Sequence, residues 1–344
     1  MQFPEKISSE NELDDVMTRP SAPLVNMIKD LPGDIMILGA AGKMGISLAL
    51  LAQRAISEAG VRKNLTCVSR FSNPQAREAL EQFGITTIAC DLLDQGALSA
   101  LPDAENIIYM AGMKFGTSGS AATTWAINSF LPGLVCRRYS RSRIVLFSTG
   151  NIYPLVPTDS GGCLETDAPS PTGEYAQSAL GRERIFEYFS TRHGFPGVIY
   201  RLNYAIDLRY GVLLDIAEQV YSDKPVNLQT GYVNVIWQGD ANSIALRCLE
   251  QACSPPLILN VTGMETLSVR KLARNFGAIF KREPFFEGQE ADTAFLSNAG
   301  RCHDLFGPFS VSIDQMISWV AYWVQAGGST LGKPTHFEVR SGVY

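Results

Sequence analysis

The stretch Asp34-Ile-Met-Ile-Leu-Gly39-Ala-Ala-Gly42-Lys-Met-Gly45 decides the fold of this chain. Its short apolar run predicts a buried strand, and the three glycines that follow are spaced as Gly-x-x-Gly-x-x-Gly. In such a turn the first glycine permits a tight bend, the second lets the backbone approach a pyrophosphate, and the third lets the next helix pack closely. The N-terminus of that helix would then face the phosphates. The stretch therefore predicts a dinucleotide site.

Further apolar runs, rich in β-branched residues, alternate with amphipathic stretches along the first part of the chain. They cover residues 65–68, 86–89, 107–110, 144–147 and 198–200. Strands that alternate with helices predict an α/β fold with a doubly wound parallel sheet of the Rossmann type. Beyond residue 203 the rhythm changes to a helix over 211–222, a strand over 232–237, and helices over 241–251 and 269–280. This part predicts a smaller C-terminal α/β lobe that supplies substrate walls.

We expect four parts in the chain. Residues 1–32 form an N-terminal extension with a short helix over 10–17, and residues 33–203 form the dinucleotide-binding core. Residues 204–330 are mainly the substrate lobe, with some elements returning to the core, and residues 331–344 are a tail.

Composition favours a small-molecule protein. The chain has 344 residues, 46% of them hydrophobic, which is enough to bury a large core. A net charge of −5 without dense runs of Lys and Arg argues against a nucleic-acid partner, and no apolar run approaches the ~18 residues of a membrane span. Seven scattered cysteines and a polar N-terminus favour a reduced, cytoplasmic protein. Three isolated histidines make a metal site unexpected.

The choice of cofactor depends on the end of the second predicted strand. A carboxylate there would accept from the ribose 2′-hydroxyl of NAD, but this chain has Ser69 and Arg70. An arginine can pair with a 2′-phosphate, so we expect NADP, with NAD as second choice. The alternative is an ordinary surface arginine. Lys43 and Met44 in the glycine turn complete this part of the expected site.

Asp91 and Leu92 follow the third predicted strand. Asp91 could accept from the adenine amino group, and it could equally cap the next turn.

Two later motifs and one asparagine carry a family resemblance. Tyr109-Met-Ala111-Gly112-Met-Lys114 resembles the Ala-Gly motif that passes the nicotinamide, and Phe147-Ser-Thr149-Gly-Asn-Ile-Tyr153 resembles a Ser-Ser/Thr-x-x-Val-Tyr signature. Asn128 resembles a helix asparagine that supports active-site geometry, although a plain polar helix residue is the alternative. In this order, from Asp34 to about Gln325, the chain resembles the extended short-chain dehydrogenase/reductases, the NAD(P)-dependent sugar epimerases, dehydratases and reductases.

The resemblance implies a catalytic tyrosine and a lysine four residues later. The stretch Glu174-Tyr175-Ala-Gln-Ser-Ala179 keeps the tyrosine and has alanine in place of the lysine. A phenol needs a nearby cation to act as a base near pH 7. We expect Lys114 to supply that charge, ahead of Arg182, with Tyr175 as the acid/base and Thr149 orienting the substrate. The stretch after Arg201 lacks the family's Pro and Gly-Pro residues, which puts the usual nucleotide-sugar contacts in doubt.

Two functions therefore remain open. The first is an NAD(P)-dependent epimerase, dehydratase or reductase that acts on a hydroxyl or keto group of a sugar or sugar acid. The alternative is a non-catalytic NAD(P)-binding sensor or regulatory protein. The resemblance also implies a homodimer through helices expected over residues 121–139 and 175–193, whose apolar side chains could instead serve the chain's own core.

Overall fold

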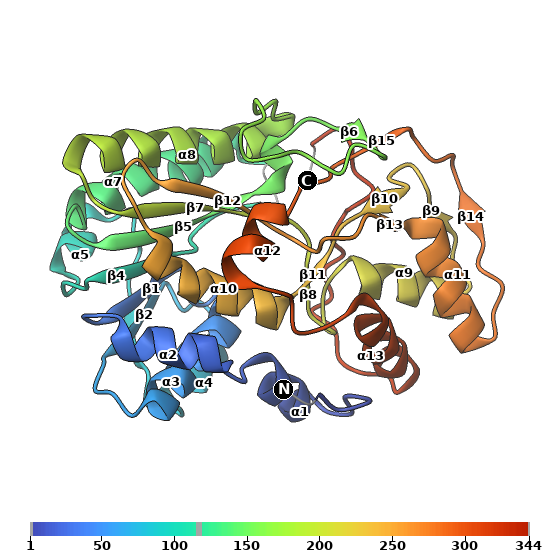
Figure 1. Cartoon of the computed structure of the whole chain (residues 1–344), viewed down its shortest axis with the longest axis horizontal. Coiled ribbons are helices and arrows are strands. Elements are labelled where there is room, and N and C mark those ends of the chain that lie inside the picture. The colour runs from blue at the N-terminus through green and yellow to red at the C-terminus, as the bar shows by residue number, and fades with distance from the viewer. Residues whose placement is uncertain (1–2, 115–118, 343–344) are drawn as a thin grey trace.

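The computed structural model describes residues 3–114 and 119–342. Seven parallel strands form its main sheet in the order β12-β7-β5-β4-β1-β2-β3 (Figure 1). The strands are β1 (Ile35–Leu38), β2 (Leu65–Ser69), β3 (Thr86–Ala89), β4 (Asn106–Tyr109), β5 (Arg143–Thr149), β7 (Gly197–Leu202) and β12 (Leu257–Val261). The order reverses direction between β1 and β4, which is the switch point of a doubly wound sheet. The predicted fold class is confirmed, and the six expected strands are found within two residues of their predicted ends.

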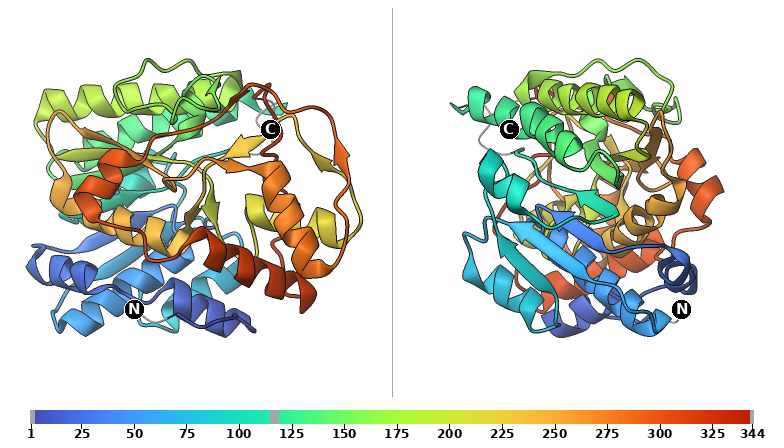
Figure 2. Two further views of the ribbon diagram at one scale, coloured as in Figure 1. Left: turned by 45° about the vertical axis from the view of Figure 1, so that its right-hand side comes forward. Right: turned by 90° about the vertical axis from the view of Figure 1, so that its left-hand side faces the viewer.

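Helices cover both faces of the sheet (Figures 1 and 2). Because side chains alternate along a strand, Ile35 and Ile37 face one side and Met36 and Leu38 the other. The first face packs against α2 (Ala22–Asp30), α3 (Gly45–Ala59), α4 (Pro74–Glu81) and α10 (Gln238–Gln251). The second face packs against α5 (Gln95–Ala100), α7 (Leu131–Arg138) and α8 (Gly173–His193). Both faces are therefore buried.

A second core lies beside the sheet. It is built around α9 (Val212–Tyr221), α11 (Val269–Phe280) and α13 (Ile313–Gln325). The remaining elements are α6 (Ala121–Trp125), η2 (Ala126–Phe130), η3 (Gly150–Ile152), β6 (Val156–Pro157), β8 (Ala205–Ile206), β9 (Val226–Asn227), β10 (Tyr232–Val233), β11 (Ile236–Trp237), β13 (Leu267–Ser268), β14 (Phe286–Glu287), β15 (Thr293–Ala294) and α12 (Gly300–Phe306). The helix α10 and the strand β12 return from this region to the main sheet.

The single strand predicted over 232–237 is wrong. Its ends form β10, which pairs with β13, and β11, which pairs with β8. Asn234 lies between the two and is buried, with its amide donating to the carbonyl of Ser297 and accepting from the side chain of Asn203. These side-chain bonds take the place of a continuous ladder.

The N-terminal extension spans both cores. Its helix α1 (Glu10–Met17) begins where the sequence predicts, with the hydroxyl of Ser9 accepting from the backbone of Glu12. Buried side chains of α1 join the second core, whereas α2, which we did not predict, packs on α3. Arg209 of the second lobe pairs with Asp14 of α1 at 2.9 Å.

The segment after α13 crosses from the second lobe to the main sheet's helices (Figure 1). The backbone and hydroxyl of Thr335 both donate to the carboxylate of Asp215, at 2.8 and 2.5 Å. Arg340 donates to the carbonyl of Thr293 at 2.7 Å. Gly342 packs against Gly173, the first residue of α8, so closely that a Cβ on Gly173 would lie 2.2 Å from the carbonyl oxygen of Gly342. The tail therefore contacts both the second lobe, at Asp215, and the start of α8, at Gly173.

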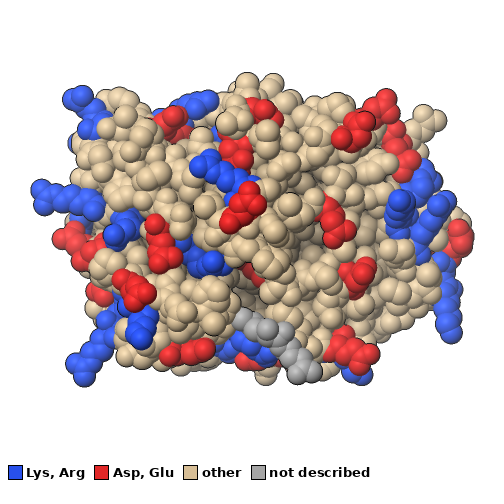
Figure 3. Space-filling model, in the orientation of Figure 1, with Lys and Arg blue, Asp and Glu red and all other residues tan. Residues whose placement is uncertain are grey.

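Charges of both signs are interspersed over the face in Figure 3. Among residues 3–114 and 119–342, no helix combines the length and apolarity needed to cross a membrane.

Candidate active site

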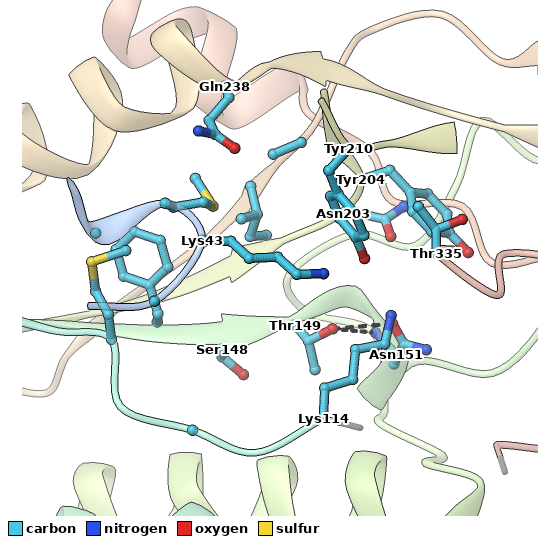
Figure 4. A pocket seen from close by; sticks show the side chains of 18 of the residues that line it. Lys43, Lys114, Ser148, Thr149, Asn151, Asn203, Tyr204, Tyr210, Gln238 and Thr335 are labelled. Atoms are coloured by element: carbon cyan, nitrogen blue, oxygen red, sulfur yellow. Dashed lines mark hydrogen bonds between the residues drawn. The ribbon is translucent and has the colours of Figure 1, made fainter. Parts of the chain in front are cut away.

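A cavity of about 360 Å³ opens at the carboxyl ends of β1, β4, β5 and β7 (Figure 4). In a doubly wound sheet this edge, beside the switch point, is where ligands bind. The glycine turn and the strand ends form one side, and the second lobe and the tail form the other. Of the predicted site residues, those that line the cavity are Gly39, Gly42, Lys43, Met44, Gly45, Gly112, Lys114, Thr149 and Tyr175.

The glycine turn has the shape that a dinucleotide needs. Gly39 has a φ of 93°, and a Cβ there would lie 2.6 Å from the backbone nitrogen of Ala111. A Cβ on Gly45 would lie 2.3 Å from the carbonyl oxygen of Ala40. At Gly42 the nearest atom to a Cβ would be 3.4 Å away. The turn is thus tightly packed at its ends and open in the middle, where a pyrophosphate would lie against the N-terminus of α3.

Asn128 holds the chain that leaves β4. It is fully buried in the π-helical turn η2, a kind of turn that is frequent at functional sites. Its amide donates to the carbonyl of Met113 at 2.9 Å and to the hydroxyl of Ser178 at 2.9 Å. Its oxygen accepts from the backbone of Met113 at 2.8 Å and from Arg182 at 2.7 Å. Asn128 therefore lies behind the cavity wall.

Tyr175 and Thr149 meet in the cavity. Tyr175 lies in the first turn of α8, Thr149 ends β5, and the two side chains share a hydrogen bond. The Thr149 hydroxyl also accepts from the backbone of Asn151 at 3.2 Å. Burial raises the pKa of the Tyr175 phenol, while the Thr149 hydrogen bond and the charge of Arg182 act to lower it.

The place of the missing lysine is filled by apolar contacts. Ala179 is buried, in a cluster with Ile152 and Tyr153, and does not line the cavity. Arg182, one helical turn farther along, does line it. Its guanidinium donates to the carbonyl of Phe147 at 2.8 Å, in addition to its contact with the helix asparagine.

Two lysines reach into the cavity from separate segments (Figure 4). The Lys114 ammonium lies 6.0 Å from the centroid of the Tyr175 ring, and that of Lys43 lies 3.2 Å from the centroid of the Tyr210 ring. Burial lowers the pKa of each lysine to about 8. The charge of Lys114 contributes to the lowering at Lys43, and Asp215 opposes it at both.

The other predicted cofactor residues lie outside the cavity lining. Ala111 follows β4 and packs against Gly39, and Ser69, Arg70, Asp91 and Leu92 lie at the ends of β2 and β3. Arg70 follows Ser69, is exposed, and makes no hydrogen bond or ion pair with any residue that the structure describes. Asp91 accepts from the backbone of Leu93 at 3.0 Å, which caps a turn, and Leu92 is buried. A cofactor in the glycine turn would extend its adenosine half along this edge, where an arginine is available to a 2′-phosphate.

A buried ion pair underlies the cavity. Arg201 of β7 and Glu183 of α8 lie 2.7 Å apart, with side chains 2% and 1% exposed. Glu183 also accepts from Ser148 of β5, and Arg201 donates to the hydroxyl of Tyr153 at 2.5 Å. That hydroxyl donates to Asn260 of β12 at 2.9 Å. The network connects α8 to three strands of the sheet.

A glycine turn after β1, a Thr149–Tyr175 contact at the end of β5 and a cavity at the switch point are the parts of a dinucleotide-dependent site. The model of the NAD dependent epimerase/dehydratase family matches residues 35–206. The chain belongs to this family. Its matched range holds both the glycine turn and the Thr149–Tyr175 pair.

Solved structures share the epimerase/dehydratase fold over most of their length. One is the UDP-glucose 4-epimerase of Thermotoga maritima with UDP-glucose, at a TM-score of 0.69, 16% identity, and coverage of 86% of this chain and 99% of that one. Another is the UDP-glucose 4-epimerase of Thermus thermophilus with NAD, at a TM-score of 0.69 and 17% identity, with coverage of 85% of this chain and 99% of that one. A third is a dTDP-glucose 4,6-dehydratase of Streptomyces venezuelae with NAD bound, at a TM-score of 0.69 and 16% identity, with coverage of 85% of this chain and 96% of that one. At these identities the likeness concerns the fold. No curated protein matches the sequence.

Several lining residues were missed from the sequence. Asn151 could have been found, because it lies two residues after Thr149 in a family signature. Tyr210 and Thr335 belong to the second lobe and the tail, whose positions depend on tertiary packing. Among residues 3–114 and 119–342, no group of three or more His, Cys, Asp and Glu side chains is arranged to hold a metal ion.

Arg201→Met is expected to reduce the free energy of unfolding by about 3–5 kcal/mol, because it leaves the Glu183 carboxylate buried and unpaired. Urea denaturation measures the free energy of unfolding of the variant and of the parent. Arg184→Met on α8, the helix that carries Glu183, serves as the control and should cost less than about 1 kcal/mol, because the Arg184–Glu187 pair is exposed. Equal losses in the two variants would contradict the structural role of the buried pair.

Proposed function

We propose that this member of the epimerase/dehydratase family uses NADP to oxidise or reduce a hydroxyl or keto carbon of a sugar or sugar acid. The observation that carries the proposal is the hydrogen-bonded pair of Tyr175 and Thr149, in a cavity that begins at the glycine turn. The nicotinamide, when bound, supplies or accepts a hydride. The chain's own residues then handle the proton and the orientation of the substrate.

In this proposal Tyr175 transfers the proton and Thr149 orients the reacting oxygen. A phenol can act near neutral pH only if its anion is stabilised by a nearby charge. Arg182 supports such a role, since its guanidinium lowers the pKa of Tyr175. Lys114 is the second candidate, with its ammonium 6.0 Å from the tyrosine ring. We therefore assign the stabilising charge to Arg182 first, which reverses the ranking of the two cations made from sequence alone.

A second candidate function is a cofactor-binding sensor or regulatory protein without turnover. One observation favours it: the lysine position is occupied by Ala179 within an apolar cluster, so the family's usual contact to the nicotinamide ribose is absent from that position. The two functions differ in whether the protein turns over a substrate. Only the first function requires the Tyr175 hydroxyl for that turnover.

We further propose NADP as the preferred cofactor. Supporting it is the exposed Arg70 at the end of β2, without a hydrogen-bonding or ionic partner among the described residues. A 2′-phosphate would give this guanidinium a charge-assisted bond.

The assembly that we propose is a cytoplasmic homodimer. Unpaired cysteines, six of them buried, are consistent with a reducing compartment. The face formed by α6, η2, α7 and α8 carries exposed aromatic side chains, with Phe130 54% and Tyr188 61% exposed. Other apolar residues of these helices, such as Val135 and Phe186, belong to the chain's own core. The exposed aromatics are the part available to a second copy.

Tyr175→Phe is expected to abolish turnover of the substrate and to change NADPH affinity by less than about twofold, because it removes only the hydroxyl that handles the proton. The test follows nicotinamide absorbance with a panel of sugars and sugar acids. Tyr188→Phe, exposed on the same helix, is the matched control and should keep parental activity. A Tyr175→Phe variant that turns over substrate at the parental rate would refute the acid/base role. A parent protein that turns over no sugar or sugar acid in the panel would favour the sensor function.

Arg70→Ala is expected to weaken NADPH binding by about 1–3 kcal/mol and to leave NADH binding nearly unchanged, because only NADPH offers a 2′-phosphate. Calorimetric titration of both cofactors measures the difference. Arg62→Ala removes the same charge from the loop before β2, at the opposite edge of the sheet, and should have little effect. Equal affinities for NADPH and NADH in the parent would eliminate the NADP assignment.

Light scattering at micromolar concentration is expected to give about twice the chain mass of 37.6 kDa. Phe130→Glu should shift the protein toward the monomer, since it places a charge in an apolar contact. Phe83→Glu, at an exposed phenylalanine outside these helices, is the control and should remain dimeric. A monomeric parent would contradict the proposed assembly.

A further inference from the structure

A four-residue turn, residues 207–210, carries Tyr210 into the wall of the cavity. The backbone groups of Asp207 and Tyr210 exchange two hydrogen bonds, at 2.9 and 3.1 Å, which close the turn at its base. The Lys43 ammonium lies 3.2 Å from the centroid of the Tyr210 ring, and Figure 4 shows these two side chains approaching each other in the cavity. The turn therefore determines where the second lobe meets the glycine turn.

The Tyr210 phenol can donate a hydrogen bond to a ligand. Among residues 3–114 and 119–342, none forms a hydrogen bond with its hydroxyl. Burial raises the pKa of the phenol, and the charges of Asp215 and Tyr175 add to the rise, so the hydroxyl keeps its proton near neutral pH. A protonated phenol both donates and accepts, which suits the hydroxyl and keto oxygens of a sugar.

The side chain of Arg209 fixes this turn from behind. Its guanidinium donates to the carboxylate of Asp207 at 3.0 and 3.1 Å and pairs with Asp14 of α1 at 2.9 Å. Glu10 of α1 lies 3.6 Å from the same group, which is largely buried, with the side chain 16% exposed. A planar guanidinium that binds carboxylates of two segments holds those segments in register. Arg209 thus connects α1 to the residue next to Tyr210.

The helix α1 is firmly held but lies outside the cavity. Its residues Leu13, Val16 and Met17 are buried in the second core, and none of the described residues that line the cavity belongs to α1. The start of the tail is attached to the same place, because the backbone of Leu331 donates to the carbonyl of Arg209 at 2.9 Å. The turn that carries Tyr210 is therefore supported by both terminal segments of the chain.

We propose that Arg209 is a positioning residue that links α1 to substrate recognition. By holding the 207–210 turn on Asp14, it places the Tyr210 hydroxyl where this group donates to an oxygen of the sugar, near Tyr175. The inference rests on the proposed function for the class of ligand. It assigns the N-terminal extension to the substrate site, although the extension lies outside the cavity.

A 3-fluorotyrosine in place of Tyr210 tests the positioning step without a substrate. Its ¹⁹F resonance is recorded in the complex with NADPH. Asp14→Asn is expected to shift or broaden this resonance, because the turn loses its charged attachment to α1. Asp14 is the better site for the change than Arg209, since its side chain is 43% exposed, whereas loss of Arg209 would leave the buried carboxylate of Asp207 without its cation.

Asp15→Asn is the matched control, with the same substitution one residue further along α1. Asp15 pairs with Arg19 and Arg54 on another side of the helix, so its loss should leave the resonance unchanged. An unchanged resonance in Asp14→Asn, or equal changes in the two variants, would overturn the proposal.

Calorimetry tests the recognition step, with a panel of hexoses and hexuronic acids added to the NADPH complex. Tyr210→Phe is expected to weaken the tightest-binding sugar about 3- to 10-fold, the range for one hydrogen bond. NADPH affinity should change less than about twofold, because the ring that faces Lys43 is kept. A panel in which no sugar binds, or in which Tyr210→Phe binds as the parent does, would overturn the proposal. A loss of NADPH affinity as large as the loss of sugar affinity would assign Tyr210 to the cofactor, with the same consequence.

A double-mutant cycle separates positioning from a general loss of structure. Asp14→Asn is expected to weaken sugar binding about 2- to 5-fold in the parent but less than about 1.5-fold in the Tyr210→Phe background, because the hydroxyl that it displaces is already gone. Equal losses in both backgrounds would mean that α1 acts on the ligand independently of Tyr210, and the proposal would fail.

The outcomes also separate this inference from the proposed function. Sugar binding that depends on Tyr210 and Asp14, without any turnover, would support the inference and count against the oxidoreductase. Turnover with a KM that Tyr210→Phe leaves unchanged would support the oxidoreductase and overturn the inference.

Discussion

The buried pair of Glu183 and Arg201 is the constraint on which the packing of α8 against the main sheet depends. Taking two charges out of water costs several kcal/mol for each ion, and the cost is recovered only when each has close partners. Here Ser148 and Tyr153 provide those additional hydrogen bonds. Since Glu183 is on α8, eight residues after Tyr175, the pair sets the distance between the helix and the sheet near Tyr175. Rotation or sliding of α8 would break it.

The same helix accounts for how a Tyr-x-x-x-Lys site can lose its lysine. A residue four positions after Tyr175 turns toward Ile152 and Tyr153, and an alanine there closes a small apolar contact. The residue seven positions after it, Arg182, returns to the cavity wall and is held by the carbonyl of Phe147. A guanidinium fixed by backbone carbonyls cannot follow a substrate as a flexible lysine does. In the proposed mechanism, the positive charge that stabilises the Tyr175 phenolate therefore comes from a guanidinium held in place by the scaffold.

Local sequence was sufficient for the sheet and the glycine turn. The glycine spacing, the apolar runs and the Ser9 cap are decided by contacts within a few residues, and they are found where they were predicted. The strand over 232–237 failed because the side chain of Asn234 bonds to residues distant in the sequence. The Tyr210 ring and Thr335 could not be assigned to the cavity for the same reason. Their positions follow from how the second core packs against the first.

The cavity is lined by residues from both ends of the chain, because the tail forms part of its wall. Gly42 and Thr335 line the same space but are separated by almost the whole chain, and the tail then continues to Gly173 at the start of α8. The glycine turn lies within the first core, where it bonds to Val68 of β2, whereas the opposite wall requires the closure of a very long loop. A ligand that contacts only the glycine turn would report on the first core alone. A ligand that also touches the far wall reports on the docking of both cores, and its binding energy adds to the stability of that docked state.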